Sequence, residues 1–226
     1  NRKISESLRN RLLGKNSTDR VVLHASTYKL RYNVHPHIYE NAEEYILGLN
    51  DLIDSINQIP AVHLIIKFRP FHLTVNDLKA ELHLSDRVTI SIDEPFLDVL
   101  GLSDLLVSFS STTIEEAFQN RVPVLLYGGG GRYQHVEALE ITPEVEVEPQ
   151  AVYAVKSPDF LADALTRILD TNGRPPLPAA LFDPYVYRPE QITTLPDLVR
   201  ELVEESTCSN DTSSGISHGE RAGFDV

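Results

Sequence analysis

Four hydroxyl residues stand together in the middle of the chain, between two short apolar segments. They are Ser110, Ser111, Thr112 and Thr113. The apolar segments predict strands over 104–108 and 122–127, and residues 114–120 between them predict a helix. The first N–H groups of a helix lack internal partners and carry the positive end of its dipole, so hydroxyl groups clustered there favour an anion. We therefore expect this segment, the hydroxyl turn, to contact a phosphate group.

A helix cap is the alternative role for the hydroxyl turn. Thr112 with Glu115, and Thr113 with Glu116, each have the spacing of a capping box. A cap needs only one hydroxyl group, whereas four are present. We expect one of the two registers to cap the helix and the remaining hydroxyl groups to reach the phosphate.

Helical geometry separates the two glutamates. If Ile114, Ala117 and Phe118 form the buried face, Glu116 points away from that face, and Glu115 lies at its margin, where it suits a cap. A carboxylate accepts two hydrogen bonds in one plane and can hold the paired hydroxyl groups of a ribose. Glu116 is the predicted ribose ligand, and a solvated surface glutamate is the alternative.

Two cations end the strand predicted over 62–68. Lys67 interrupts an otherwise apolar run, so its ammonium must leave at the strand end or meet a fixed anion. Together with Arg69 it would form a phosphate clamp. An ordinary ion pair with one of the acidic residues is the alternative interpretation.

Two loops contribute the remaining candidates. The loop after the first predicted strand carries the hydroxyl groups of Ser26 and Thr27, which could reach a phosphate or a sugar. His24 ends that strand, and we expect it to be a hydrogen-bonded packing residue more often than a catalyst. A run of four glycines includes Gly129 and Gly130 and would let the backbone approach a ligand or serve as a mobile lid.

Strand and helix patterns alternate along the whole chain. Strands are predicted over 20–25, 62–68, 87–92, 104–108 and 122–127 and within 145–155; helices are predicted over 1–15, 41–59, 74–82, 96–101, 114–120, 134–139, 158–169 and 189–205. This order predicts an α/β fold in which a doubly wound, Rossmann-like parallel sheet has flanking helices and right-handed crossovers. Ligands of such sheets bind at the carboxyl ends of the strands.

Composition suggests three parts. The chain begins with Asn1 and has no methionine, so residues 1–19 are expected to be a helix and linker from a missing N-terminal domain. Residues 20–205 would form the ligand-binding domain. Residues 206–226 are rich in Ser, Thr, Asn and Gly, cannot support a core, and are expected to be a disordered tail.

Charge and composition exclude several classes of protein. A net charge of −13 argues against a nucleic-acid surface. No apolar run approaches the roughly twenty residues of a membrane span, no signal peptide opens the chain, and the single cysteine cannot form an intrachain disulfide. We expect a soluble, cytoplasmic protein. Neither dinucleotide-binding nor P-loop motifs occur, and no histidine or carboxylate spacing favours a metal, so no cofactor and no metal are expected.

Two segments resemble a known family. The run SDLLVSFSSTTIEEAFQNRVPVLLY (103–127) resembles the signature of the C-terminal, nucleotide-binding domain of GT-B glycosyltransferases and of related surface or capsular polysaccharide biosynthesis proteins. IIKFRP (65–70) resembles their Lys-x-His-Pro element, with Arg69 in place of the histidine. The family's ribose-binding glutamate stands seven residues before a proline, which corresponds here to Glu116 before Pro123. Asn120 and Arg121 replace the glycine that the family usually has before this strand.

The resemblance implies a function. The chain would be the donor-binding half of a metal-independent glycosyltransferase that moves a sugar from a nucleotide-sugar to a polysaccharide or glycan acceptor. The acceptor and the catalytic base would belong mainly to the missing N-terminal domain, so the fragment alone would be inactive. A nucleotide-sugar 2-epimerase and a polysaccharide glycerophosphotransferase share the fold and remain alternatives. A flavodoxin-like or receiver-type regulatory module is the non-enzymatic alternative, although no acidic cluster follows the first strand.

Overall fold

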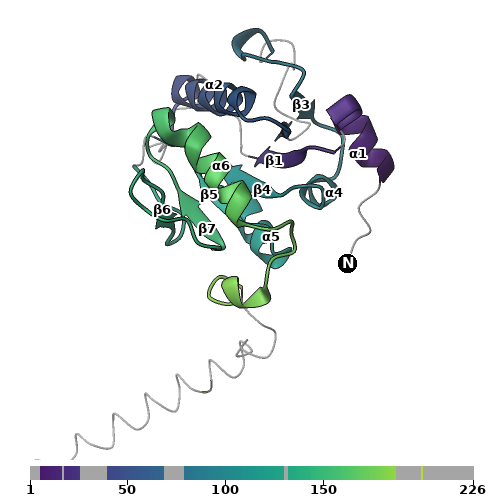
Figure 1. Cartoon of the computed structure of the whole chain (residues 1–226). Coiled ribbons are helices and arrows are strands. Elements are labelled where there is room, and N and C mark those ends of the chain that lie inside the picture. Colours follow the sequence, from purple (N-terminus) through teal and green to yellow (C-terminus); the bar gives the residue numbers. More distant parts are fainter. Residues whose placement is uncertain are drawn as a thin grey trace, which may run out of the picture. The chain divides into compact units, whose positions relative to one another are not determined.

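Seven strands form a parallel sheet in the computed structural model (Figure 1). The strands are β1 (Arg20–Ala25), β2 (Val62–Lys67), β3 (Val88–Ser91), β4 (Leu105–Ser108), β5 (Val124–Leu126), β6 (Leu139–Glu140) and β7 (Val152–Ala154). Their order across the sheet is β3-β2-β1-β4-β5-β7-β6, and every pair is parallel. The structure describes residues 6–16, 18–25, 40–68, 79–129, 132–186 and 200. This topology confirms the predicted Rossmann-like α/β fold.

Helices precede, connect and follow the strands. They are α1 (Glu6–Leu13), α2 (Ala42–Gln58), α4 (Phe96–Leu100), α5 (Thr113–Gln119) and α6 (Leu161–Thr171), with short 3-10 turns η1 (Gly14–Asn16), η3 (Pro158–Phe160) and η4 (Ala179–Leu181). The start of α2 is set by a capping box, in which Asn41 Oδ1 accepts from the Glu44 N–H and Glu44 Oε2 accepts from the Asn41 N–H, each at 2.9 Å. Within the described ranges, no helix has the length and apolar character that crossing a membrane requires.

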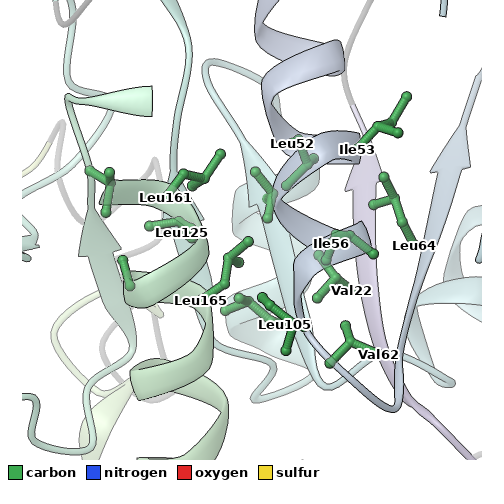
Figure 2. Packing of buried hydrophobic residues seen from close by; sticks show 14 of the residues in the cluster. Val22, Leu52, Ile53, Ile56, Val62, Leu64, Leu105, Leu125, Leu161 and Leu165 are labelled. Atoms are coloured by element: carbon green, nitrogen blue, oxygen red, sulfur yellow. The ribbon is translucent and has the colours of Figure 1, made fainter. Parts of the chain in front are cut away.

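Both faces of the sheet are covered by helices. Along β1, Val22 belongs to one apolar cluster with α2 and α6, whereas Val21 and Leu23 belong to a second cluster with α1, α4 and α5. Figure 2 shows the first cluster, in which side chains of α2 and α6 meet those of the strands. Its labelled members are Val22, Leu52, Ile53, Ile56, Val62, Leu64, Leu105, Leu125, Leu161 and Leu165. Burial on both faces explains why these strands are continuous apolar runs in the sequence.

The N-terminal helix packs on the second face. Leu12 and Leu13 of α1 are buried there, and the side chain of Arg9 donates to the main-chain carbonyls of Asp19 and Leu102. The helix thus contributes to the core of the same body as the sheet.

One predicted helix is wrong. Residues 134–138 contain no helical turn and bend at 135 and 136, and Leu139–Glu140 is the edge strand β6. The side chains of this segment hold it in an irregular path, because Gln134 Nε2 donates to the Val136 carbonyl and His135 pairs with Glu115. Six residues are also too few for a stable helix without a packed face. Most of the predicted helices 74–82 and 189–205, and the predicted tail 206–226, lie outside the described residues.

Helix α5 ends in a turn that glycine would favour. Arg121 has φ 55°, its N–H donates to the Phe118 carbonyl, and the Val122 N–H donates to the Ala117 carbonyl, both at 3.0 Å. These two bonds define a Schellman motif, whose left-handed position is normally glycine. A residue with a Cβ atom at that position costs about 1 kcal/mol or more.

Candidate functional site

The reversal of strand order creates the expected position for a ligand. The chain passes from β1 to β2 and β3 and then returns to the other side of β1 as β4, so β1 and β4 are neighbours although about eighty residues separate them. Ala25 and Ser108 end these two strands. Ligands of open α/β sheets bind outside the carboxyl ends of the strands at such a switch point. The hydroxyl turn follows β4 and therefore lies at the carboxyl ends of these strands.

Part of the hydroxyl turn holds the two strand ends together. Ser108 Oγ and Thr113 Oγ1 both donate to the Ala25 carbonyl, at 3.1 and 3.4 Å. Ser111 Oγ accepts from the Thr113 N–H at 3.3 Å. The side chains of Ser111 and Thr113 thus have structural partners that also fix the position of the turn.

The predicted capping box is wrong in both registers. Thr112 is the N-cap of α5, but its side chain makes no cap hydrogen bond. Its φ of −61° and ψ of −9° are helical rather than extended, and an N-cap side chain reaches the helical N–H groups from an extended backbone. Glu115 is exposed and pairs instead with His135 Nε2 at 2.8 Å.

Three polar side chains at this edge are available to a ligand. Ser110 is half-buried and Thr112 is exposed, and neither hydroxyl group makes a hydrogen bond with any described residue. Glu116 is half-buried, and its carboxylate has no hydrogen bond or ion pair with the described part of the chain. Thr112 and Glu116 are four residues apart and lie on the same side of α5.

The buried face of α5 is the one predicted. Ile114, Ala117 and Phe118 are all buried in the second apolar cluster. Because helical periodicity places Glu116 away from these residues, its carboxylate points out of the core.

Lys67 reaches main-chain oxygens at the ends of two strands. Its side chain is buried, and Nζ donates to the carbonyls of Phe68 and Ile92, each at 2.7 Å. Burial lowers the pKa of its ammonium, while the carboxylates of Glu94 and Asp93 raise it. One of its three N–H donors is left for another partner. Neither a carboxylate ion pair nor a phosphate is needed to explain its position.

Four predicted site residues cannot be placed. Ser26, Thr27, Arg69 and Gly130 lie outside the described residues. Their contact with a ligand stays a prediction.

Gly129 allows the backbone to pass close to an aromatic side chain. It has φ +57°, and a Cβ atom built on it would lie 2.0 Å from Phe109 Cζ. Its N–H donates at 3.0 Å to Oε1 of Glu40, which is buried. The close approach is therefore to the ring of Phe109, the residue that follows β4.

Replacing Gly129 with alanine is expected to lower the free energy of unfolding by about 2 kcal/mol, because strain in the left-handed region adds to a steric overlap. Urea denaturation would measure it. Gly14 also has a positive φ of 53° but nothing within 4 Å of a built Cβ, and Gly173 has neither feature. Gly14→Ala should cost about 1 kcal/mol, and Gly173→Ala less than about 0.5 kcal/mol. An equal effect of all three changes would contradict the contact with Phe109.

A small cavity lies beside the switch point and was not anticipated. It has a volume of about 10 Å³, the room that one water molecule needs, and its lining includes His24, Glu40, Tyr45, Phe109 and Tyr127. The ring of His24 faces that of Tyr45 at 6.1 Å, and burial lowers the pKa of His24 to about 4. His24 is therefore neutral at neutral pH and belongs to the packing, in line with its predicted role.

The segment after Gly129 is tied to helices on both faces. Arg132 Nη2 pairs with Glu44 of α2 at 2.6 Å, and His135 pairs with Glu115 of α5. The ring of Tyr133 meets Phe109 edge-on at 6.0 Å. The sequence could not show these contacts, because the partners lie on distant helices. No group of three or more potential metal ligands occurs within the described ranges.

Comparison with known proteins yields only distant structural likenesses. No protein family model and no curated protein matches the chain. A structure assigned to a UDP-N-acetylglucosamine 2-epimerase from Listeria monocytogenes has 16% identity and a TM-score of 0.44, over 75% of this chain and 43% of that one. S. aureus MnaA with UDP has 14% identity and a TM-score of 0.41, over 80% of this chain and 49% of that one. The UDP-GlcNAc 2-epimerase from Neisseria meningitidis bound to UDP-GlcNAc has 16% identity and a TM-score of 0.41, over 88% of this chain and 47% of that one.

The chain spans less than half the length of each of these three proteins. Similarity at this level assigns neither an activity nor a ligand to the chain. Epimerization is one of the alternatives that the sequence leaves open.

Proposed function

We propose that the chain is the donor-binding half of a metal-independent glycosyltransferase, which transfers a sugar from a nucleotide-sugar to a glycan or polysaccharide acceptor. One observation carries this proposal: the hydroxyl groups of Ser110 and Thr112 and the carboxylate of Glu116 flank the switch point without partners in the described chain. Hydroxyl donors suit phosphate oxygens, and a carboxylate suits the paired hydroxyl groups of a ribose.

The spacing of these groups suits a nucleotide. Residues four apart on a helix have Cβ atoms about 5–6 Å from each other, so Thr112 and Glu116 can contact neighbouring parts of one ligand. The diphosphate would lie on the hydroxyl turn, and the ribose would lie further along α5. Lys67 and Arg69 would supply positive charge to the departing nucleotide in place of a metal.

The acceptor and the general base would come from a domain that precedes this chain. Alone, the chain would bind the nucleotide without efficient sugar transfer. Binding rather than turnover is therefore the appropriate measurement.

Replacing Glu116 with alanine is expected to weaken nucleotide binding about tenfold, because hydrogen bonds to a charged acceptor are worth about 1.5 kcal/mol or more. Calorimetric titration with UDP, CMP, CDP, GDP and ADP would find the preferred nucleotide and measure the loss. Glu115→Ala is the matched control, because it removes the neighbouring carboxylate, which is exposed and pairs with His135. We expect that variant to bind as the wild type does.

A deoxy analogue makes this test specific for the ribose. The wild type should bind the 2′-deoxy form of its preferred nucleotide several-fold more weakly, whereas Glu116→Ala should no longer distinguish the two forms. EDTA should leave every affinity unchanged. If none of the five nucleotides binds, or if Glu116→Ala binds as tightly as the wild type, the proposed site is wrong.

A further inference from the structure

A groove lies at the end of the sheet opposite to the hydroxyl turn. It has a volume of about 490 Å³ and is lined by Leu102 and Asp104, which precede β4, and by Val122, which precedes β5. It therefore opens at the amino ends of the strands. Its volume is in the range of small-molecule sites, about 300–1,000 Å³. Nothing in the proposed donor site accounts for this groove.

Three arginines from distant parts of the sequence line the groove. Arg9 is on α1, Arg121 follows α5, and Arg174 follows α6. The carboxylate of Asp104 does not neutralise them fully, because Oδ2 accepts from the Val21 N–H at 2.7 Å and Oδ1 pairs with Arg20 at 3.0 Å. The groove is thus basic in a chain whose net charge is −13.

Two of the arginines repel each other electrostatically. Burial and then the neighbouring charge of Arg174 lower the pKa of Arg9, while Asp104 and Asp19 raise it. Arg9 donates to the main-chain carbonyls of Asp19 and Leu102, and Arg174 donates to that of Thr18. Like charges that line one groove destabilise each other, and an anion bound there would offset that repulsion.

The third arginine occupies a strained position. Arg121 has φ 55° at the end of α5, where glycine fits without strain, and its guanidinium makes no hydrogen bond or ion pair with any described residue. Residues held in the left-handed region cluster at functional sites, where the strain is tolerated for the side chain they present. A guanidinium also binds phosphate oxygens bidentately.

We propose that this groove binds a small phosphorylated molecule, with Arg9, Arg121 and Arg174 contacting its phosphoryl oxygens. The site is separate from the donor site, because the two lie at opposite ends of the strands. Either site can be present without the other.

Pyrophosphate is the probe for the test. Calorimetric titration of the full chain at about 0.15 M salt should show saturable binding. Arg121→Gly and Arg174→Gln should each weaken it at least fivefold. Arg11→Gln is the control, because Arg11 is on the same helix as Arg9, is 66% exposed, and pairs with Glu94 away from the groove. Lys156→Gln is a second control, because this exposed lysine pairs with Glu140 and does not line the groove, and it should also leave the affinity for pyrophosphate unchanged.

Arg121→Gly should also change thermal stability, in the direction opposite to its effect on binding. The substitution relieves the left-handed strain, so the melting temperature should rise by about 2–4 °C while binding is weakened. A residue that only supports the fold would not show this combination. Arg121→Lys keeps the charge without the bidentate geometry and should bind with intermediate affinity.

Several outcomes would overturn the proposal. These are the absence of saturable binding, an affinity that Arg121→Gly and Arg174→Gln leave unchanged, and an equal loss in Arg11→Gln or Lys156→Gln. A glutamate-rich peptide that binds and is not displaced by pyrophosphate would point to an acidic protein partner instead of a small phosphorylated molecule.

Discussion

Replacing Asp104 with alanine is expected to lower the free energy of unfolding by about 3–5 kcal/mol, the range for breaking a buried ion pair from one side. The Asp104 side chain is 3% exposed and accepts from the Val21 N–H at 2.7 Å. Its other oxygen lies 3.0 Å from Arg20 Nε. Removing the carboxylate leaves the buried Val21 N–H without its acceptor and the partly buried Arg20 guanidinium without its anion.

The loss of Asp104 should affect several elements of the fold. Arg20 also donates to the carbonyls of Leu169, at the end of α6, and of Asn172, so the pair joins the start of β1 to both β4 and α6. Unfolding in urea would measure the loss. Asp104→Asn keeps an acceptor for the Val21 N–H and should lose clearly less than alanine does.

Two further variants test the mechanism. Arg20→Leu and Asp104→Ala form a double-mutant cycle, and their effects should be less than additive, because each substitution removes the same ion pair. Asp86→Ala removes an exposed carboxylate that pairs with Lys15 at 2.6 Å, and it should change stability little. A loss of less than about 1 kcal/mol in Asp104→Ala would contradict the buried-pair argument.

The sequence could not show this role for Asp104. The residue stands at the start of a predicted strand like any polar boundary residue, and Val21 is 83 positions away. Local sequence patterns did predict the bounds of some strands and helices. The bounds of β1 agree with the prediction, because its apolar run is buried on both faces, and α2 lies between Asn41, which caps it, and Pro60, which stops it.

The same distinction applies to the candidate site. Periodicity alone placed Ile114 in the core and Glu116 on the outer side of α5. The caps were mispredicted, because a capping box depends on the backbone angles of Thr112, which the residue types do not determine. Glu115 was mispredicted because its partner, His135, is 20 residues further along the chain. Sequence patterns thus identify which faces are buried, whereas tertiary contacts decide which polar groups remain available.

Lowering the pH from about 6.5 to 4 is expected to remove about 3 kcal/mol of stability through His24 alone. Burial lowers the pKa of His24 to about 4, although the Val107 carbonyl raises it somewhat. The unfolded chain takes up the proton near pH 6.5, whereas the folded chain resists it until about pH 4. Between these two pH values the unfolded state binds more protons than the folded state, so the free energy of unfolding decreases as the pH is lowered. A difference of 2.5 pKa units at about 1.36 kcal/mol each gives a loss of about 3 kcal/mol.

His24→Leu should remove this part of the pH dependence, because the variant has no imidazole to protonate. Urea unfolding of both proteins between pH 7 and pH 4 would measure the difference in slope. Burial also lowers the pKa of His63, but this residue is present in both proteins, so its contribution cancels in the comparison. If both proteins lose stability in parallel, His24 is charged in the folded state. A charged imidazole beside the switch point would be a cation for the donor phosphate, whereas a neutral one leaves that task to the lysine and arginine side chains.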